Sequence, residues 1–189
     1  MEVALARVCR EAGAVVRTHT LLKDLNVDVR AGDNRRLEVV AQGLPLKGGA
    51  QLVVDVTLRS VLGCDGKPKP RSADEDGAVA TDARKDKENA YPELVSSNRC
   101  ALVVVALETG GRWSTEAVKF VEELSFAKAR SAQPRVRFAA TLAWRRRWSR
   151  LLSVAAGKAF ASSLVSPTGK VQQTSDGVEP ELSEVLSRE

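Results

Sequence analysis

The segment at residues 99–107 constrains the fold most because it is almost continuously apolar. It reads Arg-Cys-Ala-Leu-Val-Val-Val-Ala-Leu. A strand with one face in water would alternate apolar and polar residues, whereas a strand covered on both faces has no need to alternate. We therefore predict a central strand in a sheet that is buried on both sides.

The other predicted elements complete an αβββαβ order. We expect a helix at 2–14 that stops at Gly13, strands at 15–22, 35–41 and 51–58, a helix at 77–90, the strand at 99–107, and a helix capped by Ser114. The segment 43–49 favours a hairpin connection, whereas a helix separates the last two strands, which can therefore pair in parallel. The expected fold class is α/β with a mixed central sheet.

A length of 189 residues suits one domain with some additional structure. We predict an α/β domain at 1–132 and a basic helical extension at 133–165 that packs on it and breaks near Gly157. Residues 166–189 are rich in Ser, Gln, Glu and Gly and are expected to be disordered. The helix after Ser114 should pack through one apolar stripe, which consists of Ala117, Val118, Phe120, Val121 and Leu124.

Basic residues are concentrated in the C-terminal third of the chain. The net charge is +5, yet residues 124–175 contain no Asp or Glu and ten Lys or Arg. This asymmetry favours a polyanionic partner. The alternative is a solvated basic helix face without a partner.

Cysteine and histidine content limits the possible chemistry. Cys9, Cys64 and Cys100 have no metal-ligand spacing and are typical of reduced thiols in an intracellular protein. A single histidine, His19, argues against a histidine-based metal site or triad. No secretory signal is visible, and no apolar run approaches membrane-spanning length, so we expect no membrane partner.

Two acidic residues interrupt strand-like sequence. Asp55 lies in Gln-Leu-Val-Val-Asp-Val-Thr-Leu, and Glu38 lies in Arg-Arg-Leu-Glu-Val-Val-Ala. Burying a carboxylate is costly unless it is paired or binds a cation. Two such residues on neighbouring strands predict a shared Mg²⁺ site, because Mg²⁺ prefers oxygen ligands and keeps several waters. An exposed Glu38, and an Asp55 paired with a nearby arginine, are the structural alternatives.

The following helix offers a cation for the same site. Lys87 lies four residues before Tyr91, so both would share one helix face, and Lys87 could offset negative charge at a phosphate. Lys85 is a weaker candidate because it lies about 200° around the helix from Lys87. The alternative is that Lys87 and Tyr91 are simply solvated.

These features resemble the restriction-endonuclease-like PD-(D/E)XK fold, which has an αβββαβ core with acids on its second and third strands. Glu38 matches the first acidic position and Asp55 the second, while Thr57 stands where the motif lysine is usual. Some members of the superfamily carry this lysine on the neighbouring helix, where Lys87 would fit.

The sequence resembles more closely the nuclease-like region at the C-terminal end of non-LTR retrotransposon polyproteins, after the reverse transcriptase. The matching stretches are LARVCREAGA at 5–14, RRLEVVA at 35–41, VDVTL at 54–58, KENAYPEL at 87–94, ETGGRWS at 108–114 and AFASSL at 159–164. The resemblance implies metal-dependent nicking of DNA, with Glu38, Asp55, Lys87 and Tyr91 at the catalytic site. Because no reverse transcriptase precedes it here, we expect a fragment or a decayed copy of such an element.

Arginines supply the expected nucleic-acid contacts. Arg112, in the turn after the last strand, could contact a phosphate, although the structural alternative is a glycine turn with Trp113 packed beneath it. Trp144 and Trp148 lie four residues apart and should dock one helix face on the domain. The arginines left for a nucleic-acid backbone are Arg145, Arg146, Arg147 and Arg150.

The leading hypothesis is therefore a Mg²⁺-dependent, DNA-nicking endonuclease domain of retroelement origin. A second hypothesis is a catalytically inactive nucleic-acid-binding module of the same fold, and a third is a domain whose arginines meet acidic protein partners. DNA is the expected partner, RNA is a further candidate, and the nucleus is the candidate compartment.

Overall fold

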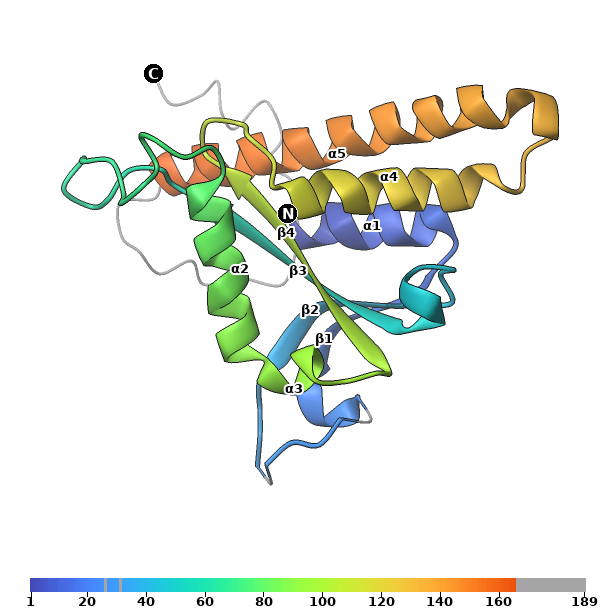
Figure 1. Ribbon diagram of the computed structural model, residues 1–189, viewed down its shortest axis with the longest axis horizontal. Helices are drawn as coiled ribbons and strands as arrows, with labels where there is room; N and C mark the ends of the chain where they lie inside the picture. Colours follow the sequence, from blue (N-terminus) through green and yellow to red (C-terminus); the bar gives the residue numbers. More distant parts are fainter. Residues whose placement is uncertain (26, 31, 166–189) are drawn as a thin grey trace, which may run out of the picture.

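The computed structural model describes residues 1–25, 27–30 and 32–165. It is a mixed α/β fold with a four-stranded sheet and helices on both faces, as Figure 1 shows. The predicted tail at 166–189 lies outside the described residues. No helix in the described part of the chain combines the length and apolarity needed to cross a membrane.

The sheet has the strand order β1-β2-β3-β4, with β1 at Val15–Leu21, β2 at Arg36–Gln42, β3 at Gln51–Arg59 and β4 at Cys100–Glu108. The first three strands are antiparallel neighbours. β4 is parallel to β3, and the connection between them runs through α2 (Ala78–Ala90) and α3 (Pro92–Val95). The predicted element order and mixed pairing are confirmed.

The prediction that residues 99–107 form a central strand is wrong, because β4 ends the strand order. Its predicted burial on both faces is correct: Leu102 and Val103 point to opposite faces and are 7% and 2% exposed. Helices cover both faces at this edge of the sheet, so an apolar run cannot distinguish an edge strand from a central one.

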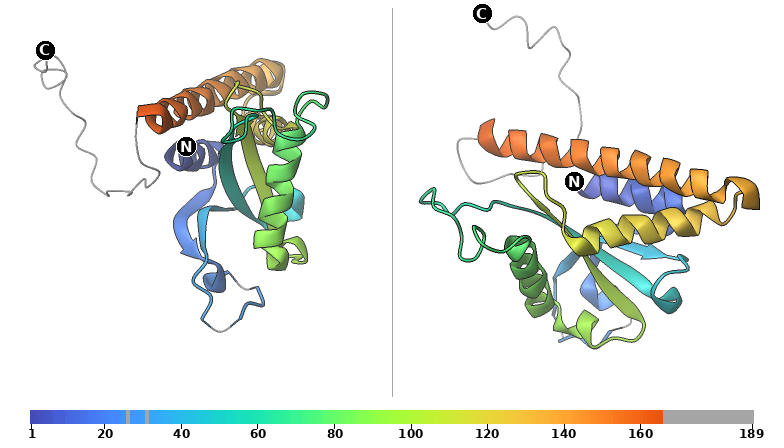
Figure 2. Two further views of the ribbon diagram at one scale, coloured as in Figure 1. Left: turned by 90° about the vertical axis from the view of Figure 1, so that its left-hand side faces the viewer. Right: turned by 45° about the horizontal axis from the view of Figure 1, so that its top comes forward.

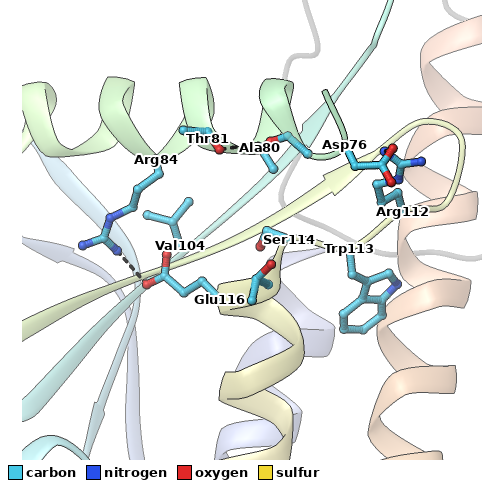
Figure 3. A pocket seen from close by; sticks show the side chains of 11 residues that line it. Asp76, Ala80, Thr81, Arg84, Val104, Arg112, Trp113, Ser114 and Glu116 are labelled. Carbon is cyan, nitrogen blue, oxygen red and sulfur yellow. Dashed lines mark hydrogen bonds and ion pairs between the residues drawn. The ribbon is translucent and has the colours of Figure 1, made fainter. Parts of the chain in front are cut away.

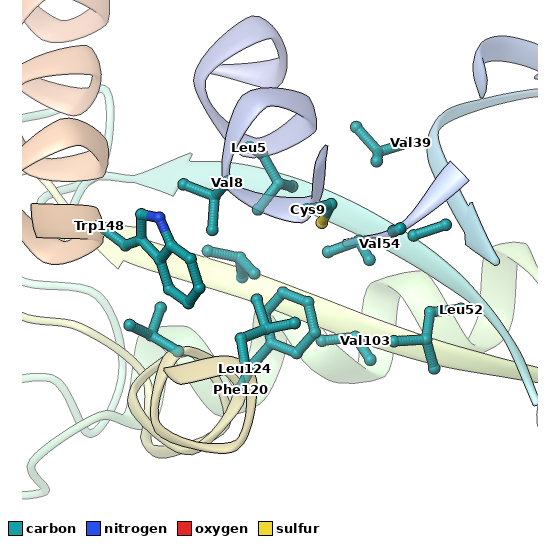
Figure 4. Close-up of a cluster of buried hydrophobic side chains, with 14 of the residues drawn as sticks. Leu5, Val8, Cys9, Val39, Leu52, Val54, Val103, Phe120, Leu124 and Trp148 are labelled. Carbon is teal, nitrogen blue, oxygen red and sulfur yellow. The ribbon is translucent and has the colours of Figure 1, made fainter. Parts of the chain in front are cut away.

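One face of the sheet packs against three helices: α1 (Glu2–Ala12), α4 (Thr115–Ala129) and α5 (Arg137–Val165). Figure 4 shows the core between them, with Trp148 of α5 beside Val8 of α1 and above Phe120 and Leu124 of α4. The opposite face packs against α2, α3 and the short 3₁₀ segment Leu22–Asp24. Figure 2 shows the sheet between these two groups of helices.

The helix ends largely agree with the sequence. Gly13 follows α1 in the left-handed conformation with φ 111°, which a residue without a Cβ adopts at little cost. The Ser114 side chain accepts a hydrogen bond from the Ala117 N–H and caps α4. Val118 was wrongly assigned to the buried stripe of α4, because its side chain is 37% exposed.

The C-terminal extension is helical and packs along α4 and α1 (Figures 1 and 2). The predicted break near Gly157 is absent, since α5 continues to Val165. A single glycine costs a helix only about 1 kcal/mol, and packing can offset this. The predicted docking of the tryptophan face is confirmed: Trp148 is fully buried, and its ring centroid lies 5.3 Å from that of Trp144.

Candidate active site

Asp55 lies within β3 on the face that is covered by α2. Val53 and Val104 belong to the core of this face, and Asp55 is only 4% exposed beside them. In the antiparallel register Val39 faces Val54, and continuing the register by one residue places Glu38 opposite Asp55. Side chains that are opposite each other on neighbouring strands share one face. The two acids predicted as metal ligands therefore lie side by side.

Lys87 of α2 reaches this position. Its Nζ lies 2.7 Å from Asp55 Oδ1 and donates a hydrogen bond to Asp55 Oδ2 at 2.9 Å. Oδ1 is buried and, despite its short distance to Nζ, accepts no hydrogen bond of good geometry from any described residue. The cation beside Asp55 is thus a lysine, not the arginine of the structural alternative, and Lys87 is not simply solvated. Both oxygens of Asp55 lie close to the Lys87 ammonium, at 2.7 and 2.9 Å.

Glu38 is half-buried at the point where the pairing of β2 with β3 ends. Its Oε2 accepts a hydrogen bond from the Val56 N–H at 2.9 Å. Burial raises the pKa of the Glu38 carboxyl, and the negative charge of Asp55 adds to this effect, while the Val56 hydrogen bond and Lys87 oppose it. Glu38 is therefore not the freely exposed strand residue of the structural alternative.

Tyr91 lies close to the two acids but not on the helix face that was predicted. It is the residue after α2, with φ −132° and ψ 57°, because the chain leaves helical geometry before Pro92. Its hydroxyl lies 3.4 Å from the Arg36 carbonyl oxygen, and the Arg35 guanidinium carbon lies 5.7 Å from its ring centroid. Burial raises the pKa of Tyr91, and the charge of Asp55 contributes further.

Glu38 and Asp55 are the residues at this site that could hold a metal ion. No group of three or more His, Cys, Asp or Glu suited to a metal occurs among the described residues. Two carboxylates are sufficient for Mg²⁺, which commonly completes its six ligands with water and substrate phosphate oxygens. The Asp55 and Glu38 carboxylates would supply oxygens to such an ion, with Asp55 shared between the ion and the Lys87 ammonium.

A cleft with a volume of about 340 Å³ opens on the same side of the sheet, between α2 and the turn that precedes α4 (Figure 3). Val104, the register partner of Asp55, lies at its base. Two ion pairs line the cleft: Arg84 with Glu116 at 2.6 Å and Arg112 with Asp76 at 2.5 Å. The predicted phosphate ligand Arg112 is thus within reach of the cleft, although an acid currently pairs with it.

The four arginines predicted on the extension fall into two groups. Arg145 pairs with Glu122 at 2.9 Å, and Arg147 donates two hydrogen bonds to Glu11, each of 2.8 Å. Arg146 and Arg150 are exposed and form no hydrogen bond or ion pair within the described ranges. Only the second group is immediately available to a polyanion, and all four lie on α5, on the other side of the sheet from Asp55.

The sequence did not predict the ion pair between Arg84 of α2 and Glu116 of α4. It also did not predict that the Glu11 carboxylate accepts a hydrogen bond from Trp148 Nε1 at 2.9 Å. Glu88 follows Arg84 by four residues and accepts a hydrogen bond from its Nε at 2.8 Å. This i,i+4 spacing was the sequence signal that could have predicted an ordered Arg84 side chain. Nothing in the local sequence indicates the Glu11 contact.

Comparison with known proteins gave no relative: no family model matches the chain, and neither does any of the curated proteins.

Proposed function

We propose that this protein is a Mg²⁺-dependent DNA endonuclease domain with a restriction-endonuclease-like fold. One observation carries the proposal: the buried Asp55 of β3 lies against the Lys87 ammonium and in register with Glu38 on β2. Two carboxylates beside a single ammonium leave a net negative charge that is costly to bury, and a cation that arrives with the substrate would offset it.

The topology supports this proposal. The described elements follow the order αβββαβ, the acids occupy the second and third strands, and β3 and β4 are parallel. Thr57 stands two residues after Asp55, where the resembled motif has lysine, and Lys87 brings the ammonium from α2 instead. The resemblance to the nuclease-like region of non-LTR retrotransposon polyproteins remains part of the proposal, as does a role on nuclear DNA.

Each residue has a distinct role in the proposed reaction. Bound Mg²⁺ would polarise the phosphodiester and lower the pKa of an attacking water. Asp55 Oδ1 and the Glu38 carboxylate would hold the ion, while Lys87 would offset negative charge that develops on the phosphate. Tyr91 would support the site through its contact with the Arg36 carbonyl.

A second function is favoured by a different observation. The Lys87 ammonium already neutralises Asp55 at 2.7 Å, so the pair can persist without a metal. A catalytically inactive nucleic-acid-binding module would keep this ion pair as a structural element and bind through exposed arginines such as Arg146 and Arg150. Binding to acidic proteins is the third function, for which the same arginines would serve.

The deciding experiment is nicking of supercoiled plasmid with Mg²⁺ by wild type, Asp55→Asn and Asp82→Asn. Asp82 lies on the same helix as Lys87 but is exposed and paired with Arg71, so it is a matched control. We expect nicking by wild type and Asp82→Asn, and at least a 100-fold loss in Asp55→Asn at unchanged fold by circular dichroism. Equal nicking by all three proteins would exclude the proposed site.

The same samples separate the remaining functions. Salt-dependent DNA binding by wild type and Asp55→Asn alike, with no nicking by either, would support the binding module. Absence of DNA binding at low salt would leave acidic protein partners as the surviving hypothesis.

A further inference from the structure

The connection between α4 and α5 carries aromatic rings and positive charge that the proposed active site does not use. We define the hairpin tip as residues 126–138, which project at one end of the helical layer in Figure 1. Phe126 lies in the last turn of α4 and is 63% exposed, and Phe138 lies in the first turn of α5 and is 77% exposed. Large apolar side chains at this exposure contribute little to the core.

The hairpin tip is uniformly positive. It contains four cationic side chains and no acid: Lys128, Arg130, Arg135 and Arg137. The nearest acids on α4, Glu122 and Glu123, have cations outside the tip as partners, at 2.9 Å from Arg145 and 3.9 Å from Lys119. The positive charge of the tip is therefore not cancelled by these neighbours.

Cations of the tip lie against aromatic rings, one within the tip and one on the adjoining part of α5. The Arg130 guanidinium carbon lies 5.8 Å from the centre of the Phe126 ring, and the Lys128 ammonium lies 5.6 Å from the centre of the Trp144 ring. Such contacts place positive charge beside aromatic rings, and rings and guanidinium groups are the side chains on which unpaired bases stack. Polar residues, Ser131 and Gln133, separate the rings, which differs from the continuous apolar face of a membrane-surface helix.

We propose that the hairpin tip binds single-stranded nucleic acid. The cations would contact phosphates, while Phe126 and Phe138 would each stack on an unpaired base. A duplex does not satisfy this surface, because its bases are already stacked on one another. This site is independent of the proposed nuclease reaction and lies in a different layer of the fold from Asp55.

The test is fluorescence anisotropy with labelled dT15, rU15 and a 15-base-pair duplex, in EDTA so that no cleavage occurs. Wild type should bind both single strands more tightly than the duplex. The double variant Phe126→Ala/Phe138→Ala should bind single strands at least roughly 30-fold more weakly, as expected when stacking on two bases is lost. Val154→Ala, an equivalent truncation of a 59% exposed residue of α5 outside the tip, should bind as wild type does.

Charge variants test the phosphate contacts separately. Arg130→Gln/Arg135→Gln should reduce the slope of log K against log salt by about 1.4 for two lost single-strand contacts. Tighter binding of dT15 than of rU15 would indicate that the ligand is DNA, and the reverse would indicate RNA. If alanine misfolds the tip, Phe126→Leu/Phe138→Leu keeps the apolar volume and should still weaken binding.

Two results would overturn the proposal. One is single-strand binding that is unchanged in both phenylalanine variants. The other is loss of binding to phosphatidylserine vesicles in these variants while oligonucleotide binding stays constant, which would assign the tip to an anionic membrane surface. Because EDTA prevents cleavage, either failure leaves the plasmid-nicking result for Asp55 unaffected.

Discussion

Two carboxylates in this protein pair with cations from helices that are distant in sequence, and they differ in the number of residues that donate hydrogen bonds to them. Glu11 accepts hydrogen bonds on both oxygens, from Arg7, Arg147 and Trp148, at 2.8–3.0 Å. Asp55 has a single partner, Lys87, whose ammonium lies 2.7 Å from Oδ1 and 2.9 Å from Oδ2.

These contacts indicate different roles for the two carboxylates. The hydrogen bonds from Arg147 lower the pKa of Glu11 to about 2, and those from Trp148 and Arg7 act in the same direction. A carboxylate with all its oxygens bonded holds two helices together. A carboxylate that is more deeply buried and paired with a single cation is a better candidate for binding a ligand.

The largest effect should follow loss of the cation beside Asp55. Lys87→Met leaves a buried carboxylate without its cation, which should lower the free energy of unfolding by about 3 kcal/mol. Urea denaturation measures this, and Lys119→Met, which removes an exposed lysine of α4, is the control. If Mg²⁺ restores stability to Lys87→Met but not to Lys87→Met/Asp55→Asn, the acid binds the ion; the absence of any Mg²⁺ effect argues against a metal site.

A smaller effect is expected at Glu11. Glu11→Gln should lower the free energy of unfolding at pH 7 by about 1–2 kcal/mol, because hydrogen bonds to a charged acceptor become neutral ones. The folded-state pKa is depressed, so the contribution of the carboxylate is complete above about pH 4.5 and is lost as pH falls towards 2. Thermal melts from pH 7 to 2 should show wild type and variant converging in this range, and a constant difference would contradict the assignment.

The smallest effect is expected at Glu38, where substitution should leave the free energy of unfolding unchanged or raise it. Burial raises the pKa of Glu38 in the folded protein, so its contribution to stability declines as pH rises from the unfolded-state value of about 4.3 through the higher folded-state value. Glu38→Gln should therefore unfold with equal or up to about 1 kcal/mol greater free energy at pH 7, since its amide oxygen can still accept the Val56 N–H. Destabilisation in denaturant melts at this pH would show that the Glu38 charge itself supports the fold.

The sequence predicted the elements well because their periodicities and caps are local. Gly13, Ser114 and the apolar strand at 99–107 each carry their signal within a few residues. The position of β4 in the sheet could not be predicted, because burial on both faces depends on which helices return to cover it. The convergence of Lys87 on Asp55 was expected only from the order of the elements, because the helix follows the Asp55 strand and no local spacing links two residues 32 positions apart.

The site was harder to predict where geometry departs from regular periodicity. Tyr91 was placed on a helix face by counting from Lys87, yet the helix ends one residue earlier, before Pro92. Arg147 was predicted to contact nucleic acid, because the sequence around the basic run contains no acidic residue that could pair with it. Its partner Glu11 is 136 positions away, and only the packing of α5 against α1 brings the two together.

The Glu11–Trp148 contact also affects how the chain can fold during synthesis. It joins the first helix to the last described one across 137 positions, so the core of the α1 face stays incomplete until most of the chain has been made. Closing so long a loop is slow compared with forming the local β1–β2 hairpin. Until α5 docks, Leu5 and Val8 of α1 and Leu124 of α4 would present apolar surface to chaperones, and a ribosome-stalled chain that stops before Trp148 should be held by them.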